Sequence, residues 1–204
     1  PANAPILMED FTEKPIAHVE VGECVVGYTF GKLGKHAKIK PATVLSTSKN
    51  HAPIVKVTTS AGRTIFCTPN HRWWRRTRTG RPSYLPLEIG SEIISVLDPI
   101  ESPSPSQQRQ YDWLGGFFDG EGNCMPNPAV SFHQSRKANE PICNRLFSAL
   151  RSVGMEFTIR EEKTGMIAAY ITGGRTAKVK LIRFCEMEKK GRIVNSIWSR
   201  EGYV

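Results

Sequence analysis

Residues 114–122 read LGGFFDGEG, an apolar run with two adjacent glycines that ends in two acids one residue apart. A glycine in a helix interior costs about 1 kcal/mol relative to alanine, so Gly115 and Gly116 together require a packing or functional reason. Glycine lets a neighbouring helix approach to about 8 Å, the near end of the usual range. The stretch predicts a closely packed helix that delivers Asp119 and Glu121 at its end, which favours a metal-dependent site at a helix interface. A buried packing helix without a site is the alternative.

The nonapeptide resembles the LAGLIDADG signature of homing endonucleases at every position, when Ala/Gly, aliphatic/aromatic and Asp/Glu exchanges are allowed. The resemblance implies that Glu121, with Gly120 beside it, binds a divalent cation at the scissile phosphate. The expected ion is Mg²⁺, with Mn²⁺ as a plausible substitute and Ca²⁺ as a non-cleaving one. Asp119 is expected to stabilise the helix end, although its carboxylate also lies close enough to count among the catalytic residues. The implied dimer interface comprises Leu114, Gly115, Gly116, Phe117 and Phe118.

Composition favours a polyanionic partner and an intracellular protein. The net charge is +9, with 14 basic and 9 acidic side chains in residues 1–110 and 14 and 10 in residues 111–204. Both halves are therefore expected to contact the partner. The five cysteines occur singly, which favours reduced thiols over a zinc site or disulfides. No apolar run approaches the roughly 20 residues that span a bilayer. We expect no membrane association and a location inside a microbe, a phage-infected cell or an organelle.

Turn residues and periodicity divide the chain into an all-β domain (1–97), a Pro/Ser-rich linker (98–110) and an α+β domain (111–204). In the first domain we predict strands at residues 23–30, 43–47, 54–59, 64–68 and 92–97. In the second we predict helices at 111–119, 141–153 and 176–187, a hairpin over 123–137, strands at 155–163 and 166–172, and a basic helical tail. This αββαββα order is that of one LAGLIDADG domain, with a first hairpin that is short for the family and turns at 126–128.

The N-terminal domain resembles an intein or Hint domain. Residues 5–28, PILMEDFTEKPIAHVEVGECVVGY, are similar to its opening, and residues 85–96 to a later strand. Residues 62–71, GRTIFCTPNH, resemble the block whose Thr-x-x-His pair activates the splice junction, here Thr68 and His71. Splicing needs a Cys or Ser nucleophile and a terminal Asn. The chain opens on proline and closes without a His-Asn pair, so we expect a vestigial site. A hydrogen-bonded Thr and His within a β domain is the alternative.

Strand alternation supplies the predicted DNA contacts. Val130 and Phe132 fall on one face of a strand, and the polar side chains of the other face are expected to face DNA. A β-ribbon fits the major groove, where Arg or Lys reads guanine. The expected contacts are Ser131, His133, Ser135, Arg136, Lys137, Thr158, Arg160, Glu162 and Lys163, with Arg136, Lys137 and Arg160 the best of them.

The family resemblance adds further catalytic positions. Gln134 matches the polar residue that organises water near the metal, and a surface glutamine is the alternative. Lys189 or Lys190 corresponds to a lysine that assists the active site, and a solvated lysine is the alternative. In the first domain, the densest basic cluster surrounds Trp73 and Trp74 and consists of Arg72, Arg75, Arg76, Arg78 and Arg81. We expect it to contact DNA phosphates beside the main site. A solvated arginine-rich hairpin is the alternative.

The sequence thus predicts a site-specific, Mg²⁺-dependent endonuclease for double-stranded DNA. Because the motif occurs once, cleavage of both strands requires a homodimer on a pseudo-palindromic target. Two other interpretations stay open. One is a catalytically inactive DNA- or RNA-binding protein, such as a regulator or a maturase, although retention of an acid at Glu121 argues against it. The other is a fragment of a split intein that acts in protein splicing.

Overall fold

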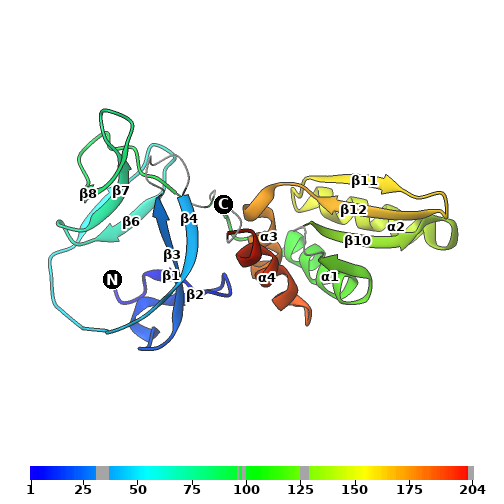
Figure 1. Cartoon of the computed structure of the whole chain (residues 1–204), viewed down its shortest axis with the longest axis horizontal. Helices are drawn as coiled ribbons and strands as arrows, with labels where there is room; N and C mark the ends of the chain where they lie inside the picture. Colours follow the sequence, from blue (N-terminus) through cyan, green and yellow to red (C-terminus); the bar gives the residue numbers. More distant parts are fainter. Residues whose placement is uncertain (31–36, 96, 98–99, 125–128, 202–204) are drawn as a thin grey trace. The chain divides into compact units, whose positions relative to one another are not determined.

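A computed structural model of the chain describes residues 1–30, 37–95, 97, 100–124 and 129–201. The chain forms two compact units, Pro1–Val96 (unit 1) and Leu97–Val204 (unit 2). Among the described residues, unit 1 consists of strands with one short 3₁₀ helix, whereas unit 2 combines a sheet with four helices (Figure 1). In the described residues, no helix has both the length and the apolar character that a bilayer crossing requires.

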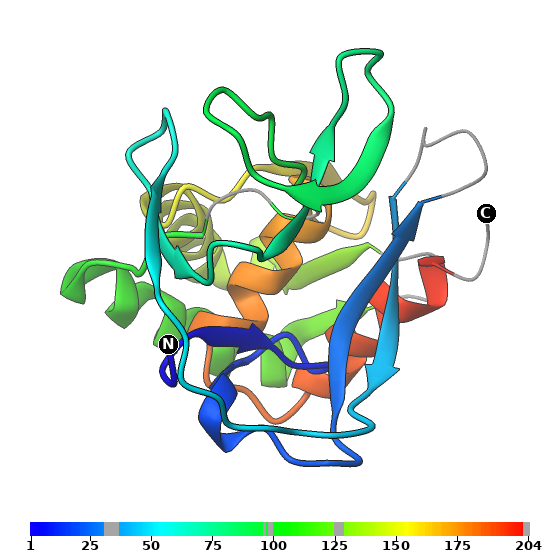
Figure 2. The same ribbon diagram turned by 90° about the vertical axis from the view of Figure 1, so that its left-hand side faces the viewer.

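The described strands of unit 1 form four separate antiparallel pairs rather than one sheet (Figure 2). These pairs are β1 (Pro5–Leu7) with β2 (Glu13–Pro15), β3 (Cys24–Phe30) with β4 (Ala37–Thr43), β5 (Val55–Thr58) with β6 (Thr64–Cys67), and β7 (Arg72–Arg76) with β8 (Pro82–Pro86). The 3₁₀ helix η1 (Ile16–His18) follows β2.

Two strand predictions in unit 1 are wrong. No strand covers the predicted range 43–47, because β4 ends at Thr43. In the predicted range 92–97, the described residues contribute an isolated bridge between Ile93 and Arg75. No strands were predicted at β7 and β8, although an arginine-rich hairpin was the alternative given for this cluster, because the arginines and aromatics there do not follow a regular polar–apolar alternation. The two strands are joined instead by cross-strand pairs such as Trp73 with Leu85.

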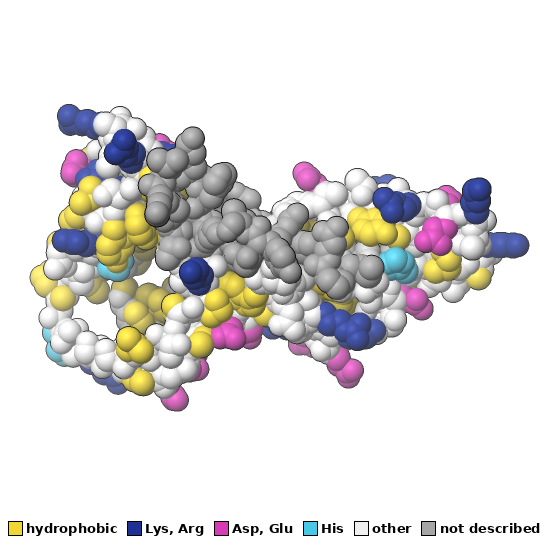
Figure 3. All heavy atoms as spheres, in the orientation of Figure 1, with side chains coloured by type: hydrophobic (Ala, Val, Ile, Leu, Met, Phe, Trp, Pro, Cys, Tyr) yellow, Lys and Arg dark blue, Asp and Glu magenta, His cyan; other side chains and the backbone are white. Residues whose placement is uncertain are grey.

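The buried core of unit 1 is small. Among its described residues, Phe11 and Ile39 are the apolar side chains that are fully buried. Many large apolar side chains are exposed instead, and hydrophobic atoms are visible over the face of unit 1 in Figure 3. The exposed set comprises Ile16, Val21, Leu45, Ile54, Val55, Phe66, Tyr84 and Ile89.

Unit 2 is built on a four-stranded antiparallel sheet in the order β11-β12-β10-β9. Its elements in chain order are α1 (Pro105–Glu121), β9 (Gly122–Cys124), β10 (Val130–Ser135), α2 (Arg136–Ser152), β11 (Phe157–Glu161), β12 (Met166–Ile171), α3 (Gly174–Phe184) and α4 (Lys190–Glu201). Helices α1 and α2 both contact β10 (Figure 1). The core between helices and sheet includes Leu114, Phe118, Phe132, Leu146 and Ile167, each at most 1% exposed.

Helix α1 begins six residues earlier than predicted, so residues 105–110 are helical rather than linker. The Ser104 side chain accepts a hydrogen bond from the backbone N–H of Gln107, and the Gln107 side chain accepts one from the backbone N–H of Ser104. This capping box and Pro105 at the first turn fix the helix start. The Pro/Ser content that favoured a linker is thus in part the helix's own start signal.

The predicted hairpin over residues 123–137 is also shorter than expected. Arg136 and Lys137 belong to the first turn of α2, where the Ser135 hydroxyl accepts a hydrogen bond from the Ala138 N–H. The helix breaks at Asn139 (φ −147°, ψ 50°), two residues before Pro141. Proline has no N–H for the carbonyl four residues earlier, and its ring clashes with that carbonyl, so a regular helix is disfavoured through this point and begins where it was predicted. The predicted turn at 126–128 lies outside the described residues.

Candidate functional site

Helix α1 ends at Glu121, whose side chain is exposed. Within the described part of the chain, its carboxylate has no hydrogen-bond or ion-pair partner, and the last turn of α1 contains no basic residue. The C-terminus of a helix carries a partial negative charge, so an acid there is unfavourable by about 0.3–1 kcal/mol. An unpaired carboxylate in this position attracts a cation. Gly120 precedes it and is exposed as well.

Asp119 has a different environment. Its Oδ2 accepts a hydrogen bond from the backbone N–H of Glu188 at 2.8 Å, and its Oδ1 accepts one from that of Lys189 at 2.9 Å. Both carboxylate oxygens are therefore engaged, and they tie the connection between α3 and α4 to the end of α1. These bonds give a physical basis for the helix-end role expected of Asp119.

The same contacts separate the two predicted lysines. The backbone N–H of Lys189 donates to Asp119, which precedes Glu121 by two residues, so the backbone of Lys189 is held at the end of α1. Its side chain is half-buried. Lys190 is the first residue of α4 and makes no hydrogen bond to Asp119 among the described contacts. The backbone of Lys189 is therefore bonded to the end of α1, and the catalytic role of either lysine stays a prediction.

Three of the five residues predicted for the dimer interface are buried within unit 2. Leu114 and Phe118 belong to its core. Gly115 lies against the chain after α3, where an added Cβ would overlap the Glu186 carbonyl oxygen. These residues therefore cannot form a surface for a partner. The reason is that a helix in a small α+β unit uses its widest apolar face for its own sheet.

The opposite side of α1 carries an open glycine stripe, which we define as Asp112, Gly116 and Gly120. All three residues are exposed, and an added Cβ at Gly116 or Gly120 would meet nothing within 4 Å. Their spacing of four residues places them on one helix face. Phe117, half-buried, stacks on Trp113 beside the stripe with ring centroids 5.1 Å apart. Two backbones could approach closely along this stripe.

The face of the sheet opposite the helices is polar and aromatic. Phe132 packs on Phe118 of α1, with centroids 5.6 Å apart, so its side of β10 faces the helices. Alternation and strand register then place the residues of the polar sheet face together: Ser131, His133, Ser135, Thr158, Arg160, Ala168 and Tyr170. This set contains five of the residues predicted to contact DNA.

Burial corrects one predicted contact of this sheet, and the strand predicted over residues 155–163 is shorter in the structure. Ser131 is fully buried, because β9 and β12 flank it, and so it cannot touch a ligand directly. Its hydroxyl lies 2.8 Å from His133 Nε2 and holds that ring instead. Glu162 follows the end of β11 rather than continuing the strand. Lys163, also exposed, lies with it in the turn before β12.

Two of the remaining predicted residues of unit 2, Arg136 and Gln134, have local partners. Arg136 forms an ion pair with Glu161 at 2.7 Å, whereas Lys137 is exposed. Gln134 lies on the same side of β10 as Phe132, two positions beyond it, and Phe132 pairs with Gly122, which follows Glu121. The Gln134 Oε1 accepts the Ser135 N–H at 2.8 Å. Gln134 is therefore near the register of the helix end, with its amide oxygen already used.

Tyr170 was not among the site residues predicted from the sequence. It is half-buried on β12, and its ring contacts both Arg160 and His133 on the neighbouring strands. The available indication was that Tyr170 lies two residues from Ala168 and therefore on the same face of the strand. An aromatic residue in an otherwise apolar strand is usually interpreted as a core residue.

The arginine cluster of unit 1 is partly neutralised. Arg75 pairs with Glu88 and Arg76 with Glu92, both at 2.8 Å. These glutamates follow 13 and 16 residues later and were not linked to the cluster by sequence. The exposed arginines without such a pair among the described residues are Arg72, Arg78 and Arg81. Thr68 and His71 close a turn through the Thr68 carbonyl and the His71 N–H, and the His71 ring packs on Trp73 at 5.1 Å.

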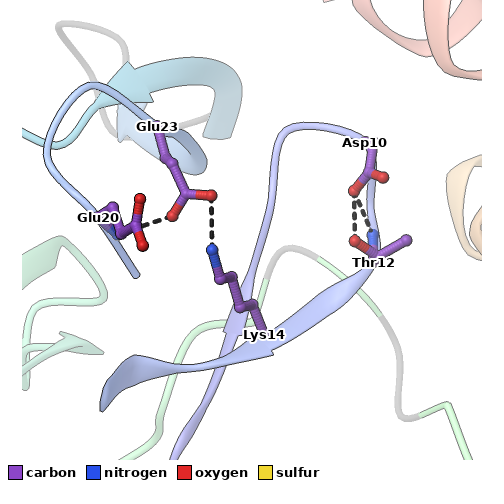
Figure 4. Close-up of polar contacts among 5 residues, drawn as sticks. All are labelled: Asp10, Thr12, Lys14, Glu20 and Glu23. Atoms are coloured by element: carbon purple, nitrogen blue, oxygen red, sulfur yellow. Dashed lines mark hydrogen bonds and ion pairs between the residues drawn. The ribbon is translucent and has the colours of Figure 1, made fainter. Parts of the chain in front are cut away.

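A second polar cluster lies around the β1–β2 hairpin (Figure 4). Lys14 Nζ lies 2.6 Å from Glu23 Oε1, and the Glu20 N–H donates to Glu23 Oε2 at 2.7 Å. The hydrogen bond from Lys14, followed by that from Glu20, lowers the pKa of Glu23. Asp10 accepts hydrogen bonds from the Thr12 N–H and hydroxyl. These contacts stabilise the hairpin, and they explain the cluster without a functional site.

Among the described residues, no group of three or more His, Cys, Asp or Glu side chains could hold a metal ion together. A site with one carboxylate per subunit does not require such a group. In comparisons with known proteins, no family model matches the chain, and no curated protein gives a significant match.

Proposed function

We propose that the chain is a site-specific, metal-dependent endonuclease for double-stranded DNA that acts as a homodimer. In this proposal unit 2 is a LAGLIDADG-type nuclease unit, and unit 1 is a Hint-derived accessory unit that adds DNA contacts. The observation that carries the proposal is the exposed, unpaired Glu121 carboxylate at the end of a helix with an open glycine stripe.

The donor set fits Mg²⁺. This ion prefers carboxylate oxygens, keeps several waters and needs only one or two protein carboxylates besides phosphate oxygens. Glu121, with the backbone at Gly120 next to it, would hold the ion, and Asp119 remains bonded to the backbone of Glu188 and Lys189. Bound Mg²⁺ supplies a nucleophilic water and relief of charge on the phosphate.

The chain's own residues do the positioning. In the proposed dimer, two copies meet along the glycine stripe, which consists of Asp112, Gly116 and Gly120. The ends of the two α1 helices then lie together, and each Glu121 acts on one strand of the duplex. Lys189, anchored beside Asp119, places a positive charge near the phosphate. The polar sheet face provides sequence contacts. The exposed arginines of unit 1 add sequence-independent phosphate contacts, which strengthen affinity at low salt.

The test is Glu121→Gln, which keeps size and polarity but removes the charge. Cleavage of a selected target in Mg²⁺ should be abolished, whereas binding in Ca²⁺ should persist. Glu140→Gln, an exposed acid on α2, is the matched control and should cleave normally. Normal cleavage by Glu121→Gln would contradict the proposal, and specific binding without any cleavage by the native chain would identify a regulator or maturase instead.

A further inference from the structure

Tyr170 lies between two side chains of the polar sheet face. The guanidinium carbon of Arg160 lies 5.5 Å from the centroid of the Tyr170 ring, on one side. On the neighbouring strand, the His133 ring meets the Tyr170 ring edge to face, with centroids 6.3 Å apart and planes at 74°. His133 is itself fixed by the Ser131 hydroxyl at 2.8 Å. Tyr170 thus connects β10, β12 and β11 on one face.

The strand register explains why the ring occupies this place. Arg160 and His133 are both partners of Ala168, one on each side of β12. Ala168 has a small side chain that leaves space between Arg160 and His133. Tyr170, two positions further along β12 on the same face, contacts both of them. Strands are spaced about 4.8 Å apart, which puts the backbones of Arg160 and His133 about 10 Å from each other. This separation corresponds to about three base-pair steps of 3.4 Å.

Arg160 is exposed and, among the described residues, has no carboxylate partner. Its contact with Tyr170 is therefore what orders the guanidinium. Ordering matters because a free arginine loses side-chain entropy when it binds, and a preorganised one loses less. A guanidinium held on an aromatic ring still presents its N–H fork edge-on, which is the geometry that recognises the O6 and N7 atoms of guanine.

The geometry points to Tyr170 as the positioning residue that holds Arg160 for recognition of guanine in the DNA major groove. This inference rests on the proposed function, since it assigns a base to one contact of the polar sheet face. It predicts one guanine per half-site that depends on Arg160, and a contribution of the Tyr170 ring, rather than its hydroxyl, to that preference.

The experiment selects bound duplexes from a randomised DNA library with the full chain in Ca²⁺ and then measures cleavage of the selected site in Mg²⁺. Arg160→Ala should lose the preference for one guanine by about 5- to 150-fold, the range of a bidentate contact. Tyr170→Leu should weaken the same preference by about two- to fivefold, the size of an exposed cation–π contact. Tyr170→Phe should keep it, which separates the ring's role from general disruption.

Arg151→Ala is the matched control. Arg151 lies over the Phe157 ring at 5.7 Å, a similar pair, but Phe157 stacks on Phe147 of α2 and so faces the helices. This variant should keep every base preference. The inference is overturned if Arg160→Ala selects the same guanines as the native chain, or if Tyr170→Leu and Tyr170→Phe behave alike. If the native chain selects no sequence and cleaves nothing, the proposed function itself is wrong.

Discussion

Replacing Gly116 should separate the stability of unit 2 from its assembly. An added Cβ at Gly116 meets nothing within 4 Å, so alanine fits without strain. Alanine is favoured over glycine in a helix interior by about 1 kcal/mol, so the monomer should gain up to that amount. For a unit of roughly 100 residues, this corresponds to a rise in Tm of about 4–8 °C. Homodimers should nevertheless be lost, because the new methyl group keeps the two helices apart.

The assay combines sedimentation velocity, DNA cleavage, and thermal unfolding at several protein concentrations. The proposed dimer of the native chain should show a Tm that rises with protein concentration, since association stabilises the folded state by mass action. Gly116→Ala should remove that dependence and reduce cleavage, and Gly116→Leu should do so completely. Gly115→Ala is the control. Its Cβ would overlap the Glu186 carbonyl oxygen, and overpacking costs about 1–3 kcal/mol, so this variant should lower the stability of unit 2 instead of raising it. A Gly116→Leu variant that still dimerises and cleaves would refute the role of the glycine stripe.

Three further predictions follow from the contacts above. Asp119→Ala leaves the N–H groups of Glu188 and Lys189 without their charged acceptor. The free energy of unfolding of unit 2, measured in urea, should therefore fall by about 1.5–3 kcal/mol, whereas Glu140→Ala should change it little. Burial raises the pKa of Cys185 from 9.0 to about 12, so its contribution to stability is complete below pH 9 and is lost as the pH rises toward 12. In that window this thiol should make the free energy of unfolding fall by about 1.4 kcal/mol per pH unit as the pH rises. Cys185→Ala should reduce that slope. Replacing Arg72, Arg78 and Arg81 by Gln should reduce the salt dependence of DNA binding by about 2.7 in slope, and an equal effect from Arg75→Gln with Arg76→Gln would contradict the distinction between paired and free arginines.

Local patterns predicted the elements of unit 2 better than the partners of individual side chains. Alternation assigned His133 and Arg160 to one face correctly, because a period of two residues is a property of the strand itself. It could not predict that Ser131 is fully buried, since burial depends on the strands at its sides. The Ser104–Gln107 capping box was legible in the sequence but was outweighed by the surrounding prolines and serines.

The glycines and arginines show the same limit. Gly115 and Gly116 are adjacent and chemically identical, yet one is buried against Glu186 and the other is exposed. Helix periodicity places Gly115 on the face of Leu114 and Phe118, but the chain that it packs against comes from the segment after α3 and is a long-range fact. Arg75 and Arg76 belonged to a basic cluster by sequence, whereas their glutamate partners come from the segment after β8. In unit 1 the same kind of long-range pairing joins Ile93 to Arg75.

The difference in core size between the units affects how each tolerates sequence change. Unit 1 depends on short hairpins and on the burial of Phe11 and Ile39, whereas unit 2 has a continuous core behind its own site. Amide hydrogens of the β5–β6 and β7–β8 hairpins should therefore exchange with solvent by local opening that leaves α1 and β10 protected. Substitutions that loosen or reshape these hairpins would alter the DNA contacts proposed for unit 1 without changing the core behind Glu121. Under the proposed function, such a chain can change its flanking contacts during evolution at little risk to cleavage.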